Sequence, residues 1–152
     1  MLVFGQDEPL AKWAARHIPD VGDGGFGPCR AVGMASPDGR KLWGVVVFNE
    51  YKPSAGLCTV SIASVYPRWA TKGTIRAILS IPFEQYGVRK LCALIPSDND
   101  RSLRLCAGLG FRREATLRHH FAPARHGVVF SMMKNEFARK WPDHASQMKE
   151  AA

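Results

Sequence analysis

The chain has 152 residues, of which 46% are hydrophobic and 22% are charged, a composition typical of one globular domain with a sizeable core and not of a disordered or fibrous chain. The formal net charge is +8, and residues 60–130 hold eleven Lys/Arg against four Asp/Glu. The longest apolar run, around Val45–Phe48, is too short to span a bilayer, and the acidic N-terminal stretch does not resemble a secretory signal.

The cysteines and the basic second half each limit the class of protein. The cysteines are widely spaced and form no CxxC pair, which favours reduced thiols in a cytoplasmic protein over a disulfide or zinc framework. They are Cys29, Cys58, Cys92 and Cys106. The concentrated positive charge has two interpretations that stay open: a solvated surface, or contact with a polyanionic ligand or partner.

The N-terminal third predicts a helix followed by a pair of strands. Asp7 can cap a helix over residues 7–17. Its apolar side carries Leu10, Trp13, Ala14 and Ile18. A Gly- and Asp-rich loop follows. Strands over residues 30–36 and 40–50 then flank the sequence SPDGR, which is a strong hairpin signal.

The central part predicts a strand, a helix and a second strand. The first strand covers residues 57–66, and a basic turn that contains glycine separates it from a helix over residues 72–86. Pro82 predicts a kink or an early end of that helix because proline has no N–H to donate. The second strand covers residues 88–96.

The C-terminal part predicts a further helix and two strands. Asp98 or Asn99 can cap a helix that ends before Gly110. Strands over residues 112–121 and 126–136 then lie on either side of the turn APARHG.

The order of these elements predicts the fold class. Helices between strands that need not form hairpins indicate an α/β or α+β sheet with a crossover connection. We expect one domain over residues 1–137 and a loose C-terminal tail over residues 138–152.

The stretch NDRSLRLCAGLGFRREATLR, residues 99–118, carries a recognisable motif. It has an asparagine, a small residue three positions later, an apolar residue, Gly-Phe, a glutamate and then Leu-Arg. The matching residues are Asn99, Ser102, Leu105, Gly110, Phe111, Glu114, Leu117 and Arg118. The motif resembles the GCN5-related N-acetyltransferase (GNAT) superfamily, and its pattern is closest to the ribosomal-protein and N-terminal-amine acetyltransferase branch. The resemblance covers roughly residues 40–136.

The turn in SVYPRWATKGTIRAIL, residues 64–79, is similar to the pyrophosphate loop of that family. Val65, Pro67, Trp69 and Gly73 match, whereas Ala70 stands where the family has Arg or Gln and Ile75 where it has Gly or Ala. Phosphate oxygens bind the free N–H groups of a helix N-terminus, and glycine lets the backbone approach closely. The resemblance implies acetyl-CoA as co-substrate. The expected cofactor-binding residues are Val65, Arg68, Trp69, Lys72, Gly73, Thr74, Arg76, Asn99 and Ser102.

The resemblance also implies candidates for acyl transfer. In the family, the side chain at the position of Asn99 lies near the pantetheine arm, although the same residue is also a good helix cap. The usual general acid is a tyrosine seven residues later, and here that position is Cys106. A cysteine is also an ordinary small core residue, and Tyr66 or Tyr86 are alternative acids.

The sequence leaves the general base open. The acidic candidates are Glu50, Asp98 and Glu114. His119 and His120 alternate along a strand, so only one of them can face a cleft, and the pair cannot chelate a metal from one face. The family resemblance implies that a backbone N–H within residues 62–65 binds the thioester oxygen. The candidate catalytic residues are Asn99, Cys106 and His119, and we expect no metal.

The family resemblance implies a specific architecture and activity. It implies a mixed, mostly antiparallel sheet of about six or seven strands with flanking helices, in which parallel neighbours 57–66 and 88–96 splay apart as a V. The implied activity is acyl-CoA-dependent N-acylation of a primary amine, on a protein or a small molecule, by a monomer or homodimer without membrane contact. Two alternatives stay open: a relative that modifies a base or nucleic acid, and a non-catalytic CoA-binding or interaction module.

Overall fold

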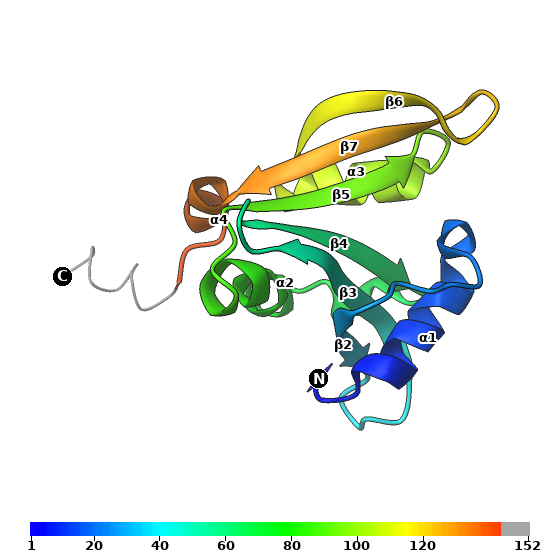
Figure 1. Ribbon diagram of the computed structural model, residues 1–152. Coiled ribbons are helices and arrows are strands. Elements are labelled where there is room, and N and C mark those ends of the chain that lie inside the picture. The colour runs from blue at the N-terminus through cyan, green and yellow to red at the C-terminus, as the bar shows by residue number, and fades with distance from the viewer. Residues whose placement is uncertain (144–152) are drawn as a thin grey trace.

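One mixed sheet of seven strands organises the protein, whose structure is a computed structural model that describes residues 1–143 (Figure 1). The strand order is β1-β2-β3-β4-β5-β7-β6. Every neighbouring pair is antiparallel except β4 and β5, which are parallel. The strands are β1 (Leu2–Val3), β2 (Cys29–Ala35), β3 (Leu42–Lys52), β4 (Leu57–Ser64), β5 (Lys90–Pro96), β6 (Arg112–Ala122) and β7 (Arg125–Met133).

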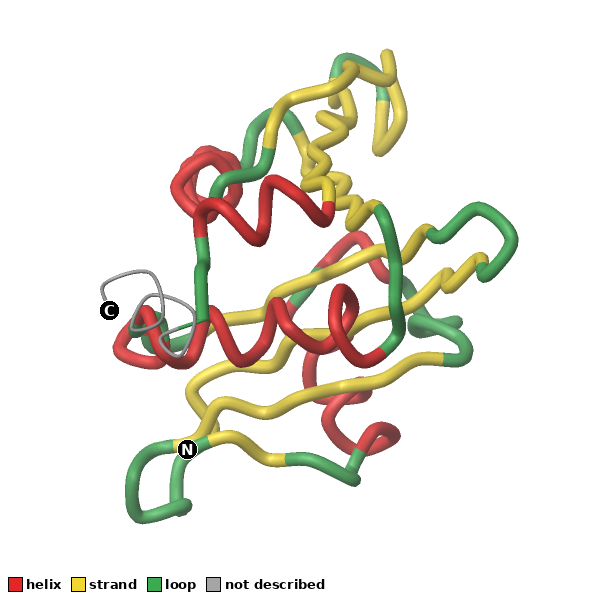
Figure 2. Tube along the Cα trace, turned by 90° about the vertical axis from the view of Figure 1, so that its left-hand side faces the viewer, coloured by secondary structure: helices red, strands yellow, loops and turns green. Residues whose placement is uncertain are grey.

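The helices cover both faces of this sheet (Figures 1 and 2). Alternation along β3 shows the two faces: Val45 and Val47 pack with Leu10 and Ala14 of the N-terminal helix, whereas Val46 belongs to the larger core on the opposite face. The helices are α1 (Asp7–His17), α2 (Lys72–Ser80), α3 (Asp100–Leu109) and α4 (Lys134–Lys140), with short turns η1 (Pro19–Val21), η2 (Pro67–Trp69) and η3 (Ile81–Gln85). Among the helices within residues 1–143, α1 alone contributes to the smaller core.

The start of α1 differs from the prediction in one respect. Gln6 occupies the N-cap position without a capping side-chain bond, and Asp7 is the first helical residue. The Asp7 carboxylate instead accepts a hydrogen bond from the Ala31 amide at 2.9 Å and pairs with Arg30 at 3.2 Å. Asp7 therefore ties α1 to β2, and it also places a negative charge in the first turn, where the helix dipole favours it.

The end of α2 confirms the predicted effect of Pro82. The α-helix stops at Ser80, and residues 81–85 form a single π-helical turn. The Tyr86 amide donates to the carbonyl of Ile81 at 3.1 Å, and the Val88 amide donates to that of Pro82 at 3.0 Å. Proline cannot donate the bond that would continue the α-helix, so the chain widens at this turn and then leads into β5.

The C-terminal prediction was wrong between residues 134 and 136. The last strand ends at Met133, and α4 begins at Lys134. Glu136 accepts from the Met133 amide at 3.0 Å, and Phe137 is buried, with its ring stacked on Phe83 at 5.0 Å. Residues 138–140 belong to this helix, and the rest of the expected tail from residue 144 lies outside the described residues. The short β1 was not foreseen.

The central splay confirms the expected architecture. The parallel strands β4 and β5 pair only through Leu57–Thr59 of β4, opposite residues 90–92 of β5. Beyond these three pairs the strands separate, while β4 continues along β3 and β5 continues along β7. The sheet is thus two antiparallel halves joined at a short parallel contact.

β3 and β4 approach each other closely at Gly44, beside the splay, and a substitution there tests this packing. A Cβ at this position would lie 2.8 Å from the carbonyl oxygen of Ala63 and 2.8 Å from Cε of Met34. We expect Gly44→Ala to lower the free energy of unfolding by about 1–3 kcal/mol, because backbone must move. Gly108→Ala in α3 is the control, since an added Cβ there meets nothing within 4 Å. Equal denaturation midpoints for the Gly44 variant and the wild type would contradict the packing argument.

Candidate functional site

A cleft of about 770 Å³ opens where β4 and β5 separate. Its walls include residues 60–64 of β4 and 93–96 of β5. Residues 17–20, at the end of α1 and in η1, line it on one face of the sheet. On the other face its lining comes from η2, α2 and α3. The cleft therefore joins the two faces of the sheet through the splay.

One backbone edge of β4 faces this cleft. The Val65 amide donates to the carbonyl of Trp43 next to β3 at 2.9 Å. Because backbone groups alternate between the two edges of a strand, those of Ile62 and Ser64 point away from β3 and towards the splay. Of the range 62–65 expected from the sequence, Ile62 and Ser64 therefore present N–H groups to the cleft, and the Val65 N–H is already used.

The turn after β4 forms one end of the cleft. Pro67, Trp69 and Ala70 line it, and Trp69 is buried with its indole N–H donating to Ser64 Oγ at 2.7 Å. Val65 is exposed and is not among the lining residues. The bulky side chain of Ile75, at the position where the family pattern has a small residue, packs into the lining and the core.

The N-terminus of α2 retains few free donors. Thr71, which the sequence analysis missed, is the N-cap, and its hydroxyl accepts from the Thr74 amide at 3.2 Å. The Ile75 amide donates to the carbonyl of Thr71. The amides of Lys72 and Gly73 are left without an acceptor among the described residues. A Cβ at Gly73 would meet nothing within 4 Å, so the protein itself does not require glycine there.

The three cations expected at this turn do not gather there. Arg68 and Lys72 are exposed and form no ion pair with a described residue. Arg76 instead donates to Glu84 at 2.7 Å and lies over the ring of Phe137, 5.0 Å from its centroid. Arg76 was expected to add charge at the turn, but in the structure its side chain joins α2 to the π turn and α4. Lys72 and Arg68 are the cations left at the turn.

The N-terminus of α3 opens on the same cleft. Asn99 caps this helix by accepting from the Ser102 amide at 3.2 Å, and both residues line the cleft. Arg101 and Arg104 of α3 also line it, and neither makes an ion pair with a described residue. The sequence analysis missed these two arginines, although they lie within its own motif.

Cys106 lies in the cleft wall but is poorly suited to acid–base chemistry. The residue is buried, and burial raises the pKa of its thiol to about 12. Transfer of its proton to a thiolate of ordinary pKa, about 8.5, would run uphill. The placement supports the packing role rather than the acid.

Of the other candidate acids and bases, Asp98 lines the cleft, and the rest lie outside its lining. His119 stands near the β6–β7 turn, where its Nδ1 accepts from the Ala124 amide at 2.8 Å and its own amide donates to His126 at 2.9 Å. Glu50 accepts from the Thr59 hydroxyl, and Glu114 pairs with Lys90 at 2.6 Å. Tyr66, Tyr86 and His120 do not line the cleft either.

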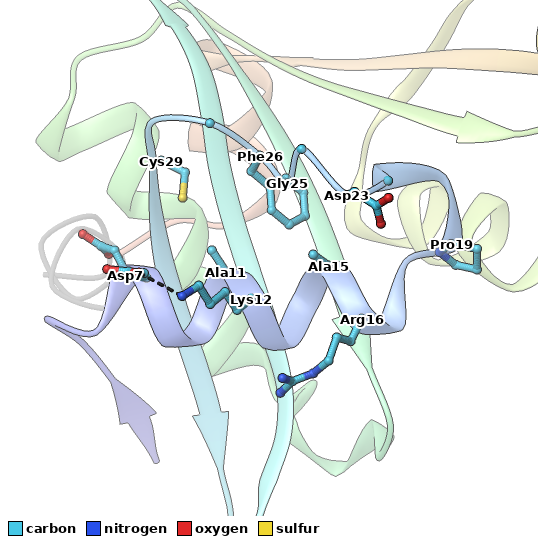
Figure 3. A pocket seen from close by; sticks show the side chains of 14 residues that line it. Asp7, Ala11, Lys12, Ala15, Arg16, Pro19, Asp23, Gly25, Phe26 and Cys29 are labelled. Carbon is cyan, nitrogen blue, oxygen red and sulfur yellow. Dashed lines mark hydrogen bonds and ion pairs between the residues drawn. The ribbon is translucent and has the colours of Figure 1, made fainter.

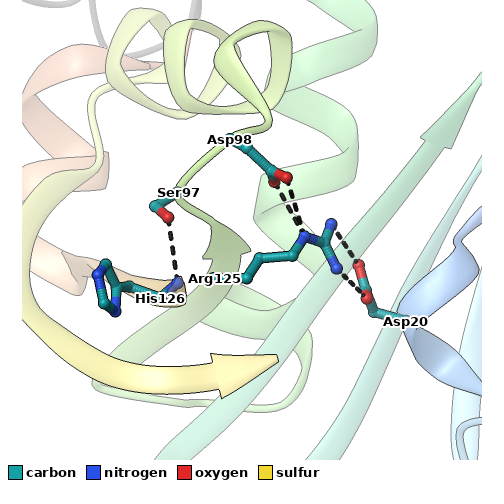
Figure 4. Close-up of polar contacts among 5 residues, drawn as sticks. All are labelled: Asp20, Ser97, Asp98, Arg125 and His126. Carbon is teal, nitrogen blue, oxygen red and sulfur yellow. Dashed lines mark hydrogen bonds and ion pairs between the residues drawn. The ribbon is translucent and has the colours of Figure 1, made fainter. Parts of the chain in front are cut away.

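An ion network that the sequence analysis did not foresee crosses the mouth of the cleft. Arg125, from the start of β7, donates to Asp20 of η1 at 2.5 Å and to Asp98 at 3.0 Å (Figure 4). All three residues line the cleft. The guanidinium beside Asp98 lowers the pKa of that carboxyl, and the two carboxylates raise the pKa of Arg125. The network joins the α1 half of the molecule to the β5–β7 half.

A second cavity, of about 820 Å³, lies between α1 and the Gly-rich loop (Figure 3). The side chains of Phe26 and Cys29, on the loop side of the cavity, point towards α1. The side chain of Arg16 points away from the loop. Its lining holds the carboxylates of Asp7 and Glu8 and no residue of α2 or α3. It is slightly larger than the cleft, but neither of the two helix N-termini that could bind phosphate opens on it.

Two further findings concern metals and membranes. Within residues 1–143, no group of three or more His, Cys, Asp or Glu side chains is placed to hold a metal ion. No helix in the same range is long and apolar enough to cross a membrane.

Several solved structures share this architecture. A chimera of the spermidine N-acetyltransferase SpeG from Vibrio cholerae with hSSAT superposes with a TM-score of 0.68 at 14% identity, covering 90% of this chain and 97% of that one. A second structure, named provisionally as an acetyltransferase, superposes with a TM-score of 0.64 at 21% identity. The match covers 75% of this chain, and it spans only 61% of that protein. The ribosomal-protein-S5-alanine acetyltransferase from Vibrio fischeri gives 0.60 at 12% identity, covering 72% of this chain and 63% of that one.

These likenesses show that the chain shares the fold of these acetyltransferase structures, which is the fold that its sequence motif implied. Identities this low show the fold alone. No protein-family model and no curated protein sequence matches the chain.

The cross-cleft network can be tested by amide exchange. We expect Arg125→Gln to speed exchange in residues 18–28 and 122–126, because η1 loses its tie to the β6–β7 turn. In the wild type, the same protection should be present above the unfolded-state pKa of Asp98, near 3.8, and fade as pH falls through its lowered folded-state value. Arg118→Gln, on exposed β6, is the control. Unchanged protection in the Arg125 variant would show that the network does not stabilise η1 or the β6–β7 turn.

Proposed function

We propose that the chain is an acyl-CoA-dependent N-acyltransferase that transfers an acetyl group from acetyl-CoA to a primary amine by direct attack. The observation that carries this proposal is the cleft at the β4–β5 splay. It joins the two faces of the sheet and exposes a backbone edge of β4 at its centre. Two substrates that enter from opposite faces can therefore meet beside free backbone donors.

The residues on the α2 and α3 side fit an extended, anionic co-substrate. A pantetheine arm carries amide groups, which can pair with the free edge of β4 at Ile62 and Ser64 as an added strand would. The pyrophosphate fits the free amides of Lys72 and Gly73, with the Lys72 ammonium adding charge. Arg101 and Arg104 supply further positive charge on the same side, which offsets the loss of Arg76 from the turn.

Direct transfer asks little of the side chains beyond position and charge. The amine nitrogen bonds to the thioester carbonyl carbon and gives up a proton, the C–S bond breaks, and the sulfur leaves as a thiolate that then gains a proton. Charge develops on the carbonyl oxygen during attack, and a backbone N–H of Ile62 or Ser64 can stabilise it. Asn99 lies beside the path as a cleft-lining amide.

The names of the similar structures suggest the chemical class of the acceptor. The similar structures are named for acetylation of spermidine and of an alanine of a ribosomal protein. These acceptors share a primary amine, and we propose the same group here, on a small molecule or a protein.

The direct test is a product assay. The protein is incubated with acetyl-CoA and, separately, spermidine and a peptide that begins with alanine, and mass spectrometry looks for a gain of one acetyl group. We expect at least one acetylated amine, formed with stoichiometric release of CoA. Tight CoA binding without any product would favour a binding module, and no CoA binding at all would reject the proposal.

The turn residues predict a specific pattern of CoA affinity. Gly73→Val should weaken CoA binding by tenfold or more because its side chain fills the phosphate approach, and Lys72→Ala should weaken it by about 1 kcal/mol. Arg76→Ala should leave affinity unchanged but lower the melting temperature, since Arg76 packs on Phe137. Calorimetry and thermal denaturation separate the two effects. Normal CoA affinity in the Gly73 variant would remove the turn from the site.

Asn99 and Cys106 should behave differently. Asn99→Ala should slow acyl transfer by tenfold or more, which is about 1.4 kcal/mol in the barrier. Asn99→Ser keeps a helix-capping oxygen, so if both variants are slow the amide acts in the cleft, and if only the Ala variant is slow it acts as a cap. Cys106→Ser and Cys106→Ala should both retain near-normal turnover. A large loss confined to the Ala variant would contradict the packing role.

A further inference from the structure

The proposed reaction needs a group that accepts the proton of the amine. The titratable side chains that line the cleft, apart from its arginines, are His17, Asp20, Asp98 and Cys106. This set is drawn from the described residues. Glu50, Glu114 and His119, which the sequence suggested, are not part of it.

Three of these four groups are unsuited to the task. Asp20 and Asp98 both accept hydrogen bonds from the Arg125 guanidinium, so their oxygens are already engaged. The lowered pKa of Asp98 also makes it a weak base. Burial keeps the Cys106 thiol protonated, because its pKa is raised to about 12. His17 is left.

His17 is held in an orientation that suits a base. It is the last residue of α1, and its Nδ1 lies 2.7 Å from the carbonyl oxygen of Trp13. A carbonyl oxygen can only accept, so Nδ1 carries the hydrogen of this bond. In the neutral ring Nε2 then has the free lone pair. The imidazole also stacks on the Trp13 ring with centroids 3.9 Å apart and an interplanar angle of 26°, which fixes its plane.

We propose that His17 is the general base that takes the proton from the acceptor amine at the α1 side of the cleft. The inference rests on the proposed acyl transfer and adds the residue that starts it. It also assigns the acceptor to the α1 face, opposite the α2 and α3 N-termini that suit the CoA phosphates.

The step balances without any further reagent. The amine lone pair forms the N–C bond as the C–S bond breaks, and the amine proton moves to Nε2 of His17. The sulfur leaves as a thiolate and gains a proton from solvent. The imidazolium then returns its proton to solvent, so His17 is unchanged after each cycle.

The charges around His17 come from several elements. Arg16 precedes it in α1, Asp20 follows in η1, and Asp98 and Arg125 lie across the mouth of the cleft. The arginines of α3 line the cleft from its other side. A second role for His17 is ordinary stabilisation of the α1 C-terminus by a cation. That role would change stability but not the pH dependence of turnover.

The test compares His17→Gln with Arg16→Gln, a neighbouring variant outside the cleft. Acylation of the best amine from the product assay is measured from pH 5 to 9, with CoA affinity and melting temperature in parallel. In the wild type, kcat/KM should rise with pH as the general base loses its proton. His17→Gln should lose 100-fold or more in kcat/KM and that rise, while CoA affinity is retained. Arg16→Gln should match the wild type.

Each outcome decides the inference. A His17→Gln enzyme with near-normal turnover, or with the wild-type pH profile at a reduced rate, would overturn the base and leave the acyltransferase proposal intact. A wild-type protein that acylates no amine would overturn both. Partial recovery of His17→Ala by added imidazole, at concentrations that do not change the wild type, would support the base directly.

Discussion

The structure depends on the short length of the pairing between β4 and β5. Three residue pairs at Leu57–Thr59 hold the two parallel strands together, and beyond them each strand follows a different antiparallel neighbour. A longer parallel ladder would close the sheet and cover the free edge of β4. The crossover through α2 starts at the open end of β4 and returns to the closed end of β5, so the N-terminus of α2 lies at the mouth of the splay. The cleft, its backbone donors and the position of the α2 N-terminus all follow from this one register.

A sheet that splays in the middle needs other contacts to hold its halves at a fixed angle. The larger core supplies most of this restraint, because residues of α2, α3 and α4 pack together beneath both halves. On the α1 face the smaller core reaches β1, β2, β3 and β4, and within residues 1–143 it includes no residue of β5, β6 or β7. There Arg125 bridges the gap to Asp20 and Asp98, so a polar network acts where apolar packing stops. This arrangement leaves the α1 mouth bounded by polar groups, which suits the amine acceptor that we propose.

Local signals in the sequence predicted most of the fold, and contacts distant in sequence account for the rest. The hairpin turns, the kink at Pro82 and the cap at Asn99 each depend on a few adjacent residues, so they were predictable. Residues 134–136 looked like strand because α4 depends on burial of the Phe137 side chain against distant partners. Arg76 looked like a phosphate ligand because its pairing with Glu84 depends on the π turn. A contact between residues 20 and 125 leaves no periodic signal, and the place of His17 in the cleft was equally hidden.

The central claim is that the β4–β5 splay is the acyl-CoA site. The most direct measurement is a crystal structure of the protein with CoA. The account predicts the pantetheine arm between the separated strands, with its amides against Ile62 and Ser64, its pyrophosphate at the Lys72 and Gly73 amides, and its sulfur pointing to the mouth that His17 lines. CoA bound in the groove between α1 and the Gly-rich loop, or elsewhere on the surface with the splay closed by side chains, would contradict it.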